Sequence, residues 1–317
     1  MVIIISAKPL IVVALGGNAI LRRGERGDVD EQWRNVRRAA ESIVNIFERG
    51  FRIVVTHGNG PQIGALMEMI ELAREKIPPL TMDIASAMTQ AWIGYMLQLE
   101  IGNVLEERGF ERRVATIINT VSVDPLDEAF KEPTKFIGPF YSFEEARKLS
   151  IEKKWVFKED PRGGWRRVVP SPKPIMNNEI EAIKTLLEKD FIVIASGGGG
   201  VPVARSGSRL ISVEAVIDKD LASALLAIRL GADRFIILTD VDGAYLNYGK
   251  PNATLLRRIS VYEAKKLIQE GVFGEGSMKP KIEAAIMFTE ATGRISIIGN
   301  LDKALEVIDG EGTVVYI

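Results

Sequence analysis

Short runs of apolar, mostly β-branched residues recur along the whole chain, and longer stretches with helical periodicity separate them. The runs are Ile11–Leu15, Arg52–Thr56, Val114–Ile118, Phe191–Ala195, Arg234–Thr239, Arg294–Ile298 and Thr313–Tyr316. Nearly continuous apolar runs of this length are typical of parallel strands that are covered on both faces. The regular alternation of such strands with helices predicts a layered α/β fold.

The stretches between these runs have the pattern of amphipathic helices. Val36, Ala40, Ile43 and Phe47 recur at helical spacing and form one apolar stripe, and residues 180–187 repeat the pattern. Ser260 and Glu263 form a capping box, which predicts a helix from Val261 to Ile268.

The most apolar long stretch, Met82 to Leu105, contains Asp83 and Glu100 and is therefore unlike a membrane span. We interpret it as a buried or interface helix. It carries more apolar residues than one stripe requires, so we expect a homodimer that uses this segment.

One region, Asp124–Pro174, interrupts the alternation. It is rich in Pro, Gly, Lys, Arg and aromatic residues, and we interpret it as an inserted subdomain. Within it we expect a short helix around Phe143–Leu149 and a hairpin near Arg162–Trp165.

Composition excludes several kinds of chemistry. The chain has no cysteine and one histidine, so disulfides, thiolate sites, a cysteine nucleophile and a multi-histidine metal site are excluded. The net charge of −1 gives no bulk attraction to nucleic acid or to an anionic membrane, and we expect neither as a partner. The apolar start is short, lacks a preceding positive charge and contains Pro9, unlike a signal peptide, so we expect a cytoplasmic protein.

Three glycine-rich turns each follow a predicted strand. They are Leu15–Ala19, Thr56–Gln62 and Ser196–Gly200. Ligands of parallel α/β sheets lie beyond the carboxyl ends of the strands, where glycines let backbone N–H groups approach an anion. A single glycine after a strand is often only a tight turn, but three such turns in one chain favour a shared anion site.

The tetraglycine resembles a dinucleotide fingerprint, and Asp218 follows at a suitable distance. However, Pro202 stands where the helix of that motif would begin, and the chain continues through Arg205–Ser208 like a hairpin. No glycine-rich turn ends in Gly-Lys-Ser/Thr, and the protein-kinase motif set is missing.

Lys219 and Lys281 lie near predicted helix starts, against the preference of cations for helix C-termini. This placement is tolerable if an anion lies between them, although any one lysine could simply be a solvated surface charge.

Several segments resemble carbamate kinases of the amino-acid kinase superfamily, including the archaeal type that acts as a carbamoyl phosphate synthetase. They are Ala14–Ala19, Thr56–Gln62, Pro133–Lys135, Gly138–Tyr141, Ile194–Pro202, Glu214–Asp220, Leu238–Gly243 and Gly276–Lys281. The similarity runs in order from about residue 11 to the C-terminus. Lys279 departs from the usual small residue, and the first ten residues extend beyond the usual start.

The resemblance implies a three-layer α/β/α sandwich with a mainly parallel central sheet and a protruding subdomain. It implies one amino-acid kinase domain over 1–317, in which an N-terminal lobe (1–212, with 124–174 inserted) takes carbamate or carbamoyl phosphate. A C-terminal lobe (213–317) would take ATP or ADP. Related kinases carry a lysine where this chain has Ala14, and Lys135 of the insertion would replace it.

The resemblance also implies roles for particular residues. Lys135, Lys219 and Lys281 would surround the transferring phosphoryl group, and Asp218 would orient them. The acceptor would meet Gly16, Gly17, Asn18, His57, Gly58, Asn59, Gln62, Gly198, Gly199 and Gly200. The nucleotide would meet Thr239, Asp240, Tyr248, Met278 and Lys281, and Mg²⁺ would be held mainly by ATP phosphates rather than by a protein site. For His57, a hydrogen bond that stabilises its turn is an equal alternative.

Two other functions compete with this interpretation. One is a related kinase that phosphorylates a different small acid, against which Ala14 and the insertion argue. The other is a nucleotide sensor without catalysis, which would not need all three lysines. The sequence leaves the direction of phosphoryl transfer open.

Overall fold

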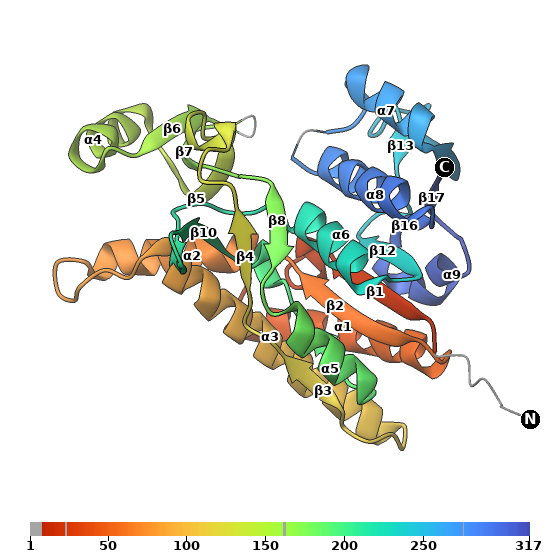
Figure 1. Cartoon of the computed structure of the whole chain (residues 1–317). Coiled ribbons are helices and arrows are strands. Elements are labelled where there is room, and N and C mark those ends of the chain that lie inside the picture. The colour runs from red at the N-terminus through yellow and green to blue at the C-terminus, as the bar shows by residue number, and fades with distance from the viewer. Residues whose placement is uncertain (1–7, 23, 161–162, 275) are drawn as a thin grey trace, which may run out of the picture.

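The computed structural model describes residues 8–22, 24–160, 163–274 and 276–317, and its centre is an eight-stranded sheet (Figure 1). The strand order is β15-β17-β16-β12-β1-β2-β9-β3, and only the β16–β17 pair is antiparallel. The bounds are β1 Leu10–Leu15, β2 Arg52–His57, β3 Val114–Thr116, β9 Ile192–Ile194, β12 Arg234–Thr239, β15 Arg258–Ser260, β16 Ser296–Asn300 and β17 Thr313–Tyr316. The prediction of a mainly parallel α/β fold is confirmed.

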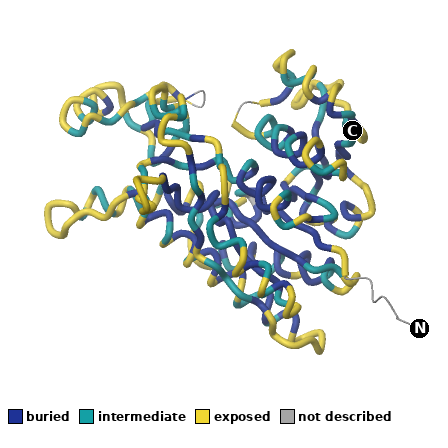
Figure 2. The backbone as a smooth tube through the Cα atoms, in the orientation of Figure 1, coloured by how far each residue is buried: buried dark blue, intermediate teal, exposed yellow. Residues whose placement is uncertain are grey.

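Helices cover both faces of this sheet, as the alternation along β1 shows. Ile11 and Val13 point into the core beneath α1 (Val29–Glu48), α3 (Met82–Glu107) and α9 (Ala304–Ile308). Val12 and Ala14 point the other way, beneath α5 (Ile180–Glu188), α6 (Lys219–Leu230), α7 (Val261–Gln269) and α8 (Met278–Thr292). Successive side chains of a strand face opposite sides, so one buried strand serves two cores. The tube in Figure 2 is accordingly dark blue through the sheet and yellow at the outer loops.

The predicted strands are all present; β12 and β17 have the predicted ends, and the ends of the other five are shifted by one or two residues. In β16 both ends shift by two residues, so that the strand begins at Ser296 rather than at Arg294. Gly293 ends α8 in a left-handed conformation, and Arg294 then turns to donate hydrogen bonds to the carbonyls of Gly231 and Ala232. The capping contacts of Arg294 therefore delay the start of the strand.

A second sheet was not foreseen. It has the order β11-β10-β4-β8, with β4 Thr120–Val123, β8 Pro174–Asn177, β10 Val201–Ser206 and β11 Arg209–Ser212. These strands are short and lack long apolar runs, so periodicity does not reveal them. The expected hairpin through Arg205–Ser208 is confirmed as the β10–β11 pair.

Residues 124–173 leave the second sheet at the end of β4 and return at the start of β8. Between them lie β5 (Lys135–Tyr141), α4 (Phe143–Lys153), β6 (Val156–Glu159) and β7 (Trp165–Val169), which stand apart at the upper left of Figure 1. We call these elements the protruding subdomain. The predicted helix is confirmed, and β6 and β7 pair as a hairpin. Arg162, which was part of the hairpin prediction, lies outside the described residues.

Ion pairs join the protruding subdomain to the rest of the chain. Lys153 pairs with Glu71 of α2 (Gly60–Ala73), and Arg167 pairs with Glu214. The ring of Trp155 lies under both cations, with the Arg167 guanidinium carbon 4.1 Å and the Lys153 ammonium 4.6 Å from its centroid. Such stacked, partly desolvated cations favour one orientation of the subdomain.

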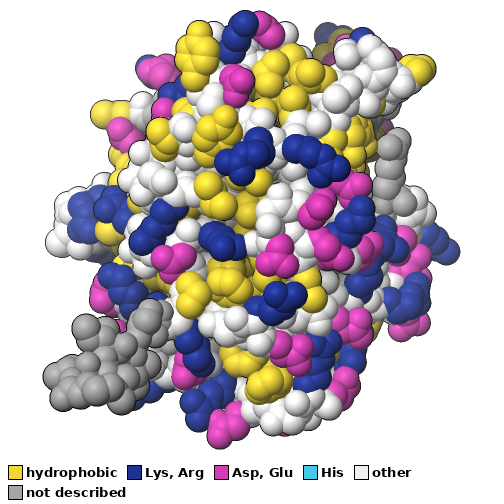
Figure 3. All heavy atoms as spheres, turned by 90° about the vertical axis from the view of Figure 1, so that its right-hand side faces the viewer, with side chains coloured by type: hydrophobic (Ala, Val, Ile, Leu, Met, Phe, Trp, Pro, Cys, Tyr) yellow, Lys and Arg dark blue, Asp and Glu magenta, His cyan; other side chains and the backbone are white. Residues whose placement is uncertain are grey.

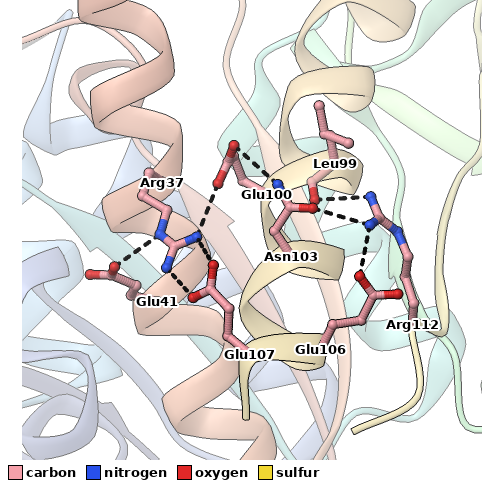
Figure 4. A network of polar contacts seen from close by, with 8 residues as sticks. All are labelled: Arg37, Glu41, Leu99, Glu100, Asn103, Glu106, Glu107 and Arg112. Carbon is pink, nitrogen blue, oxygen red and sulfur yellow. Dashed lines mark hydrogen bonds and ion pairs between the residues drawn. The ribbon is translucent and has the colours of Figure 1, made fainter. Parts of the chain in front are cut away.

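A charged network joins α1 to α3 on the outside of the molecule (Figure 4). Arg37 of α1 contacts Glu41 on its own helix and both Glu100 and Glu107 of α3. Its guanidinium group bridges the two helices, which supplements the apolar contacts beneath them.

Charged side chains of both signs are interspersed over the face that lies to the right in Figure 1 and faces the viewer in Figure 3. This distribution agrees with the balanced count of 41 basic and 42 acidic residues. None of the described helices has both the length and the hydropathy of a bilayer span.

Candidate functional site

The carboxyl ends of β1, β2 and β12 open into a cleft of about 930 Å³. Most of the residues predicted for the site line it. They are Gly16, Gly17, Gly58, Asn59, Lys135, Gly198, Asp218, Lys219, Thr239, Asp240, Tyr248, Met278 and Lys281. His57, Gln62, Gly199 and Gly200 are buried and do not line the cleft, and the side chain of Asn18 is outside the part that the structure describes.

Asp218 joins the protruding subdomain to the start of α6. One of its oxygens, Oδ1, accepts a hydrogen bond of 2.9 Å from the backbone N–H of Asp220 and so caps the helix. Its other oxygen, Oδ2, lies 2.8 Å from Nζ of Lys135, the first residue of β5. The capped helix therefore holds the carboxylate in place, and the carboxylate holds Lys135 at the cleft.

Asp220 is the centre of the lysine cluster, and sequence analysis missed it. Its carboxylate is 3% exposed and lies 2.5 Å from Nζ of Lys219 and 3.3 Å from Nζ of Lys281. Burial alone would raise the pKa of Asp220, but the two ammonium charges outweigh burial and lower it to about 2. The run Asp218-Lys219-Asp220 at a helix start could have pointed to Asp220, because a buried lysine needs a nearby carboxylate to balance its charge.

Lys281 lies at the opposite side of this cluster, at the start of α8. Its ammonium also donates to the carbonyl of Ser277 over 3.2 Å. Burial lowers the pKa of Lys281, as does the charge of Lys219, while Asp220 opposes the shift. The cluster contains three ammonium groups and two carboxylates, so it retains positive charge for an anion although the chain as a whole is nearly neutral.

The tetraglycine turn allows close packing beneath the cleft. A Cβ on Gly197 would lie 2.5 Å from Nε2 of His57, and a Cβ on Gly198 would lie 2.2 Å from Nδ2 of Asn59. Gly198 also has a φ of +63°, which disfavours any side chain there. The glycines at these positions therefore let the 56–62 turn and the 196–200 turn meet.

His57 is buried against Gly197, and Nδ1 hydrogen-bonds the carbonyl of Gly58 over 3.0 Å. Burial lowers the pKa of His57 to about 4, the nearby charge of Lys219 also lowers it, and the Gly58 bond opposes both. The ring is thus neutral at pH 7 and donates from Nδ1. This geometry favours the turn-stabilising interpretation over direct contact with an acceptor.

The buried neutral ring predicts a pH-dependent stability. The pKa of His57 falls from 6.5 in the unfolded chain to about 4 in the fold, so the unfolded state binds more protons between these values. We expect the free energy of unfolding to drop by about 2 kcal/mol between pH 7 and pH 5. Urea titrations of the wild type and of His57→Gln measure this, and the variant should show a much flatter dependence over that range. An equal slope in both proteins contradicts the assignment.

The other end of the cleft is apolar and aromatic. Tyr248 and Met278, which were predicted, lie there with Tyr245 and Phe273, which were not. The rings of Tyr245 and Tyr248 are 5.9 Å apart. The cleft therefore has one cationic end and one end suited to a flat, partly apolar ring.

Among the described residues, no three His, Cys, Asp or Glu side chains are arranged to hold a metal ion. Asp218 and Asp220, which face the cleft, already pair with lysines. These residues fit a divalent ion that arrives on a phosphorylated ligand better than one held by the protein alone.

Comparisons with known proteins are consistent along the chain. The family model described as "Amino acid kinase family" matches residues 9–300. The carbamate kinase of Thermococcus kodakarensis is 51% identical over 304 residues, which cover 95% of this chain and 96% of the relative. The carbamate kinase of Pyrococcus horikoshii is 50% identical over 303 residues, with 95% and 96% covered. The structure of a carbamate kinase from Giardia lamblia bound to AMP-PNP superposes with a TM-score of 0.92 at 42% identity, covering 98% of this chain and 99% of that one.

Proposed function

The chain belongs to the amino acid kinase family, and from that membership we propose that it is a carbamate kinase, which transfers a phosphoryl group between ATP and carbamate. The observation that carries this proposal is the position of Lys135. The position two residues before Gly16, where related kinases of other specificity carry a lysine, is the buried Ala14, and a lysine from the protruding subdomain reaches the cleft instead.

The reaction needs no general base in the protein. Carbamate is an anion, and its oxygen attacks the γ-phosphorus while the bond from that phosphorus to the β–γ bridging oxygen breaks. The electron pair leaves with ADP, and no proton is transferred. Catalysis then depends on positioning and on stabilising charge, as is usual for phosphoryl transfer.

We assign the charge stabilisation to Lys135, Lys219 and Lys281, whose ammonium groups face the cleft from three parts of the chain. Asp218 holds Lys135 in place, and Asp220 holds both Lys219 and Lys281. Backbone N–H groups at Gly16, Gly17 and Gly198 are the candidate donors to the acceptor end.

The nucleotide would lie at the aromatic end, near Thr239, Asp240, Tyr248 and Met278. A kinase that uses ATP requires a divalent ion in general, and Mg²⁺ on the ATP phosphates would supply further neutralisation of their charge. The lobes at 1–212 and 213–317 would then hold acceptor and nucleotide respectively. An enzyme that uses ATP or ADP needs a supply of these nucleotides, which is consistent with the cytoplasmic location expected from the sequence.

A coupled assay of ATP formation from ADP and carbamoyl phosphate tests the proposal. We expect turnover with carbamoyl phosphate and little with acetyl phosphate or other acyl phosphates at equal concentration. Turnover only with another acyl phosphate would instead favour the related kinase that acts on a different small acid.

We also expect a homodimer through α3. Ile84, Met88 and Tyr95 of this helix are 45%, 41% and 59% exposed, and their spacing places them along one side of it. Sedimentation velocity at micromolar concentration should give a dimer, and Met88→Glu should give a monomer. The control is Ile151→Glu on α4, where an exposed apolar side chain is changed in the same way. A monomeric wild type contradicts the expectation.

A further inference from the structure

Gly58 lies directly after β2, where the stem of Lys219 crosses the 56–62 turn. A Cβ at Gly58 would lie 3.0 Å from Cδ and 3.1 Å from Cε of Lys219, and 3.6 Å from Cα of Gly17. The two distances to Lys219 are shorter than a normal contact between carbon atoms, whereas the distance to Gly17 is an ordinary one. The backbone of Gly58 is not left-handed, so its conformation alone does not require glycine.

The stem of Lys219 is held at both ends. Its backbone begins α6 next to the capping residue Asp218, and its Nζ lies 2.5 Å from the buried carboxylate of Asp220. The path between these points passes over Gly58. The position of the ammonium therefore depends on the space that the missing Cβ leaves.

We propose that Gly58 is a positioning residue for Lys219, which holds the ammonium in line with the transferring phosphoryl group by leaving room for the lysine stem. The proposal rests on the function proposed above. It differs from the contact with the acceptor that the resemblance implies for Gly58, because an alanine keeps the backbone N–H group and removes only the space.

The added methyl of Gly58→Ala would push Cδ and Cε of Lys219 aside by a few tenths of an ångström. The ammonium at the end of the stem would then move relative to Asp220 and to the reacting group. A misplacement of about 1 Å can slow an enzyme about 100-fold, so we expect about a 10-fold loss of kcat for this smaller movement. The KM for ADP should change less than about twofold, because the aromatic end of the cleft is untouched.

A double-mutant cycle with Lys219→Ala tests the proposal. Lys219→Ala removes the atoms that the new methyl would meet, so Gly58→Ala should slow the wild type and have no further effect on Lys219→Ala. The same slowing in both backgrounds would overturn the proposal, because the methyl would then block the cleft itself. An unchanged kcat in the wild-type background would also overturn it.

Two measurements do not depend on activity. In the wild-type background, the ¹³Cε signal of Lys219, assigned by its loss in Lys219→Ala, should shift in Gly58→Ala. An unshifted signal would count against the proposal. If Gly58→Ala lowers the midpoint of thermal unfolding, the double variant should recover it, and failure to recover would exclude the contact. A wild type without carbamate kinase activity would refute the proposed function, while these two measurements would still decide the role of Gly58.

Discussion

Lys219→Ala and Lys281→Ala are each expected to lower kcat by about 10²–10³-fold, the scale for removing one preorganised group that stabilises charge in the transition state. Both ammonium groups face the cleft and are fixed on the same buried carboxylate. Folding should persist in each variant, because Asp220 keeps the other lysine as its partner.

Steady-state assays of ATP formation measure this effect, and circular dichroism at pH 7 checks the fold. The matched control is Lys184→Ala, which removes a lysine that pairs with Glu181 on the exposed side of α5. Its rate should equal that of the wild type. Rates near wild type in both site variants would refute the assignment of the cluster.

Lys135→Ala should lower kcat on the order of 10²-fold while the KM for ADP changes little. Lys135 belongs to the protruding subdomain, whereas the residues assigned to the nucleotide lie on or near β12 and α8. Asp218 would lose this ion pair but keep its bonds to the start of α6, so the helix should remain capped.

We propose that the subdomain acts as a lid that carries Lys135 to the reacting group and excludes water. Hydrogen exchange within residues 124–174 should then slow when both substrates are bound. The control is Lys131→Ala, a lysine of the same insertion whose side chain is 70% exposed. Normal turnover of Lys135→Ala, together with exchange that ligands do not change, would rule out a catalytic lid.

The central sheet could be predicted because each of its long strands carries its own apolar signal. The strands of the second sheet could not, since β4 and β8 mix polar with apolar residues and pair with distant parts of the chain. Local pattern is informative where burial is complete on both faces, and it fails where pairing alone defines the strand.

The candidate site likewise has a part that the sequence predicts and a part that only the fold reveals. Glycine-rich turns and the resemblance predicted the lysines, but the contact that brings Lys281 to Asp220, beside Lys219, joins residues that are 61 positions apart. The burial that separates His57 from the cleft is likewise a property of the packed turns and not of the motif around it. The sequence predicted many of the residues that belong to the site, whereas the contacts between them could be identified only from the fold.

The antiparallel pairing of β4 with β8 places the two ends of the protruding subdomain side by side, with Val123 opposite Pro174. Because the subdomain starts and ends at neighbouring residues of one strand pair, its length and sequence can change without shifting the register of any strand in the central sheet. The lysine that completes the cleft is carried on this exchangeable piece. A changed insertion could therefore place a different side chain at the position of Lys135, while the residues of the central sheet that line the cleft stay in place.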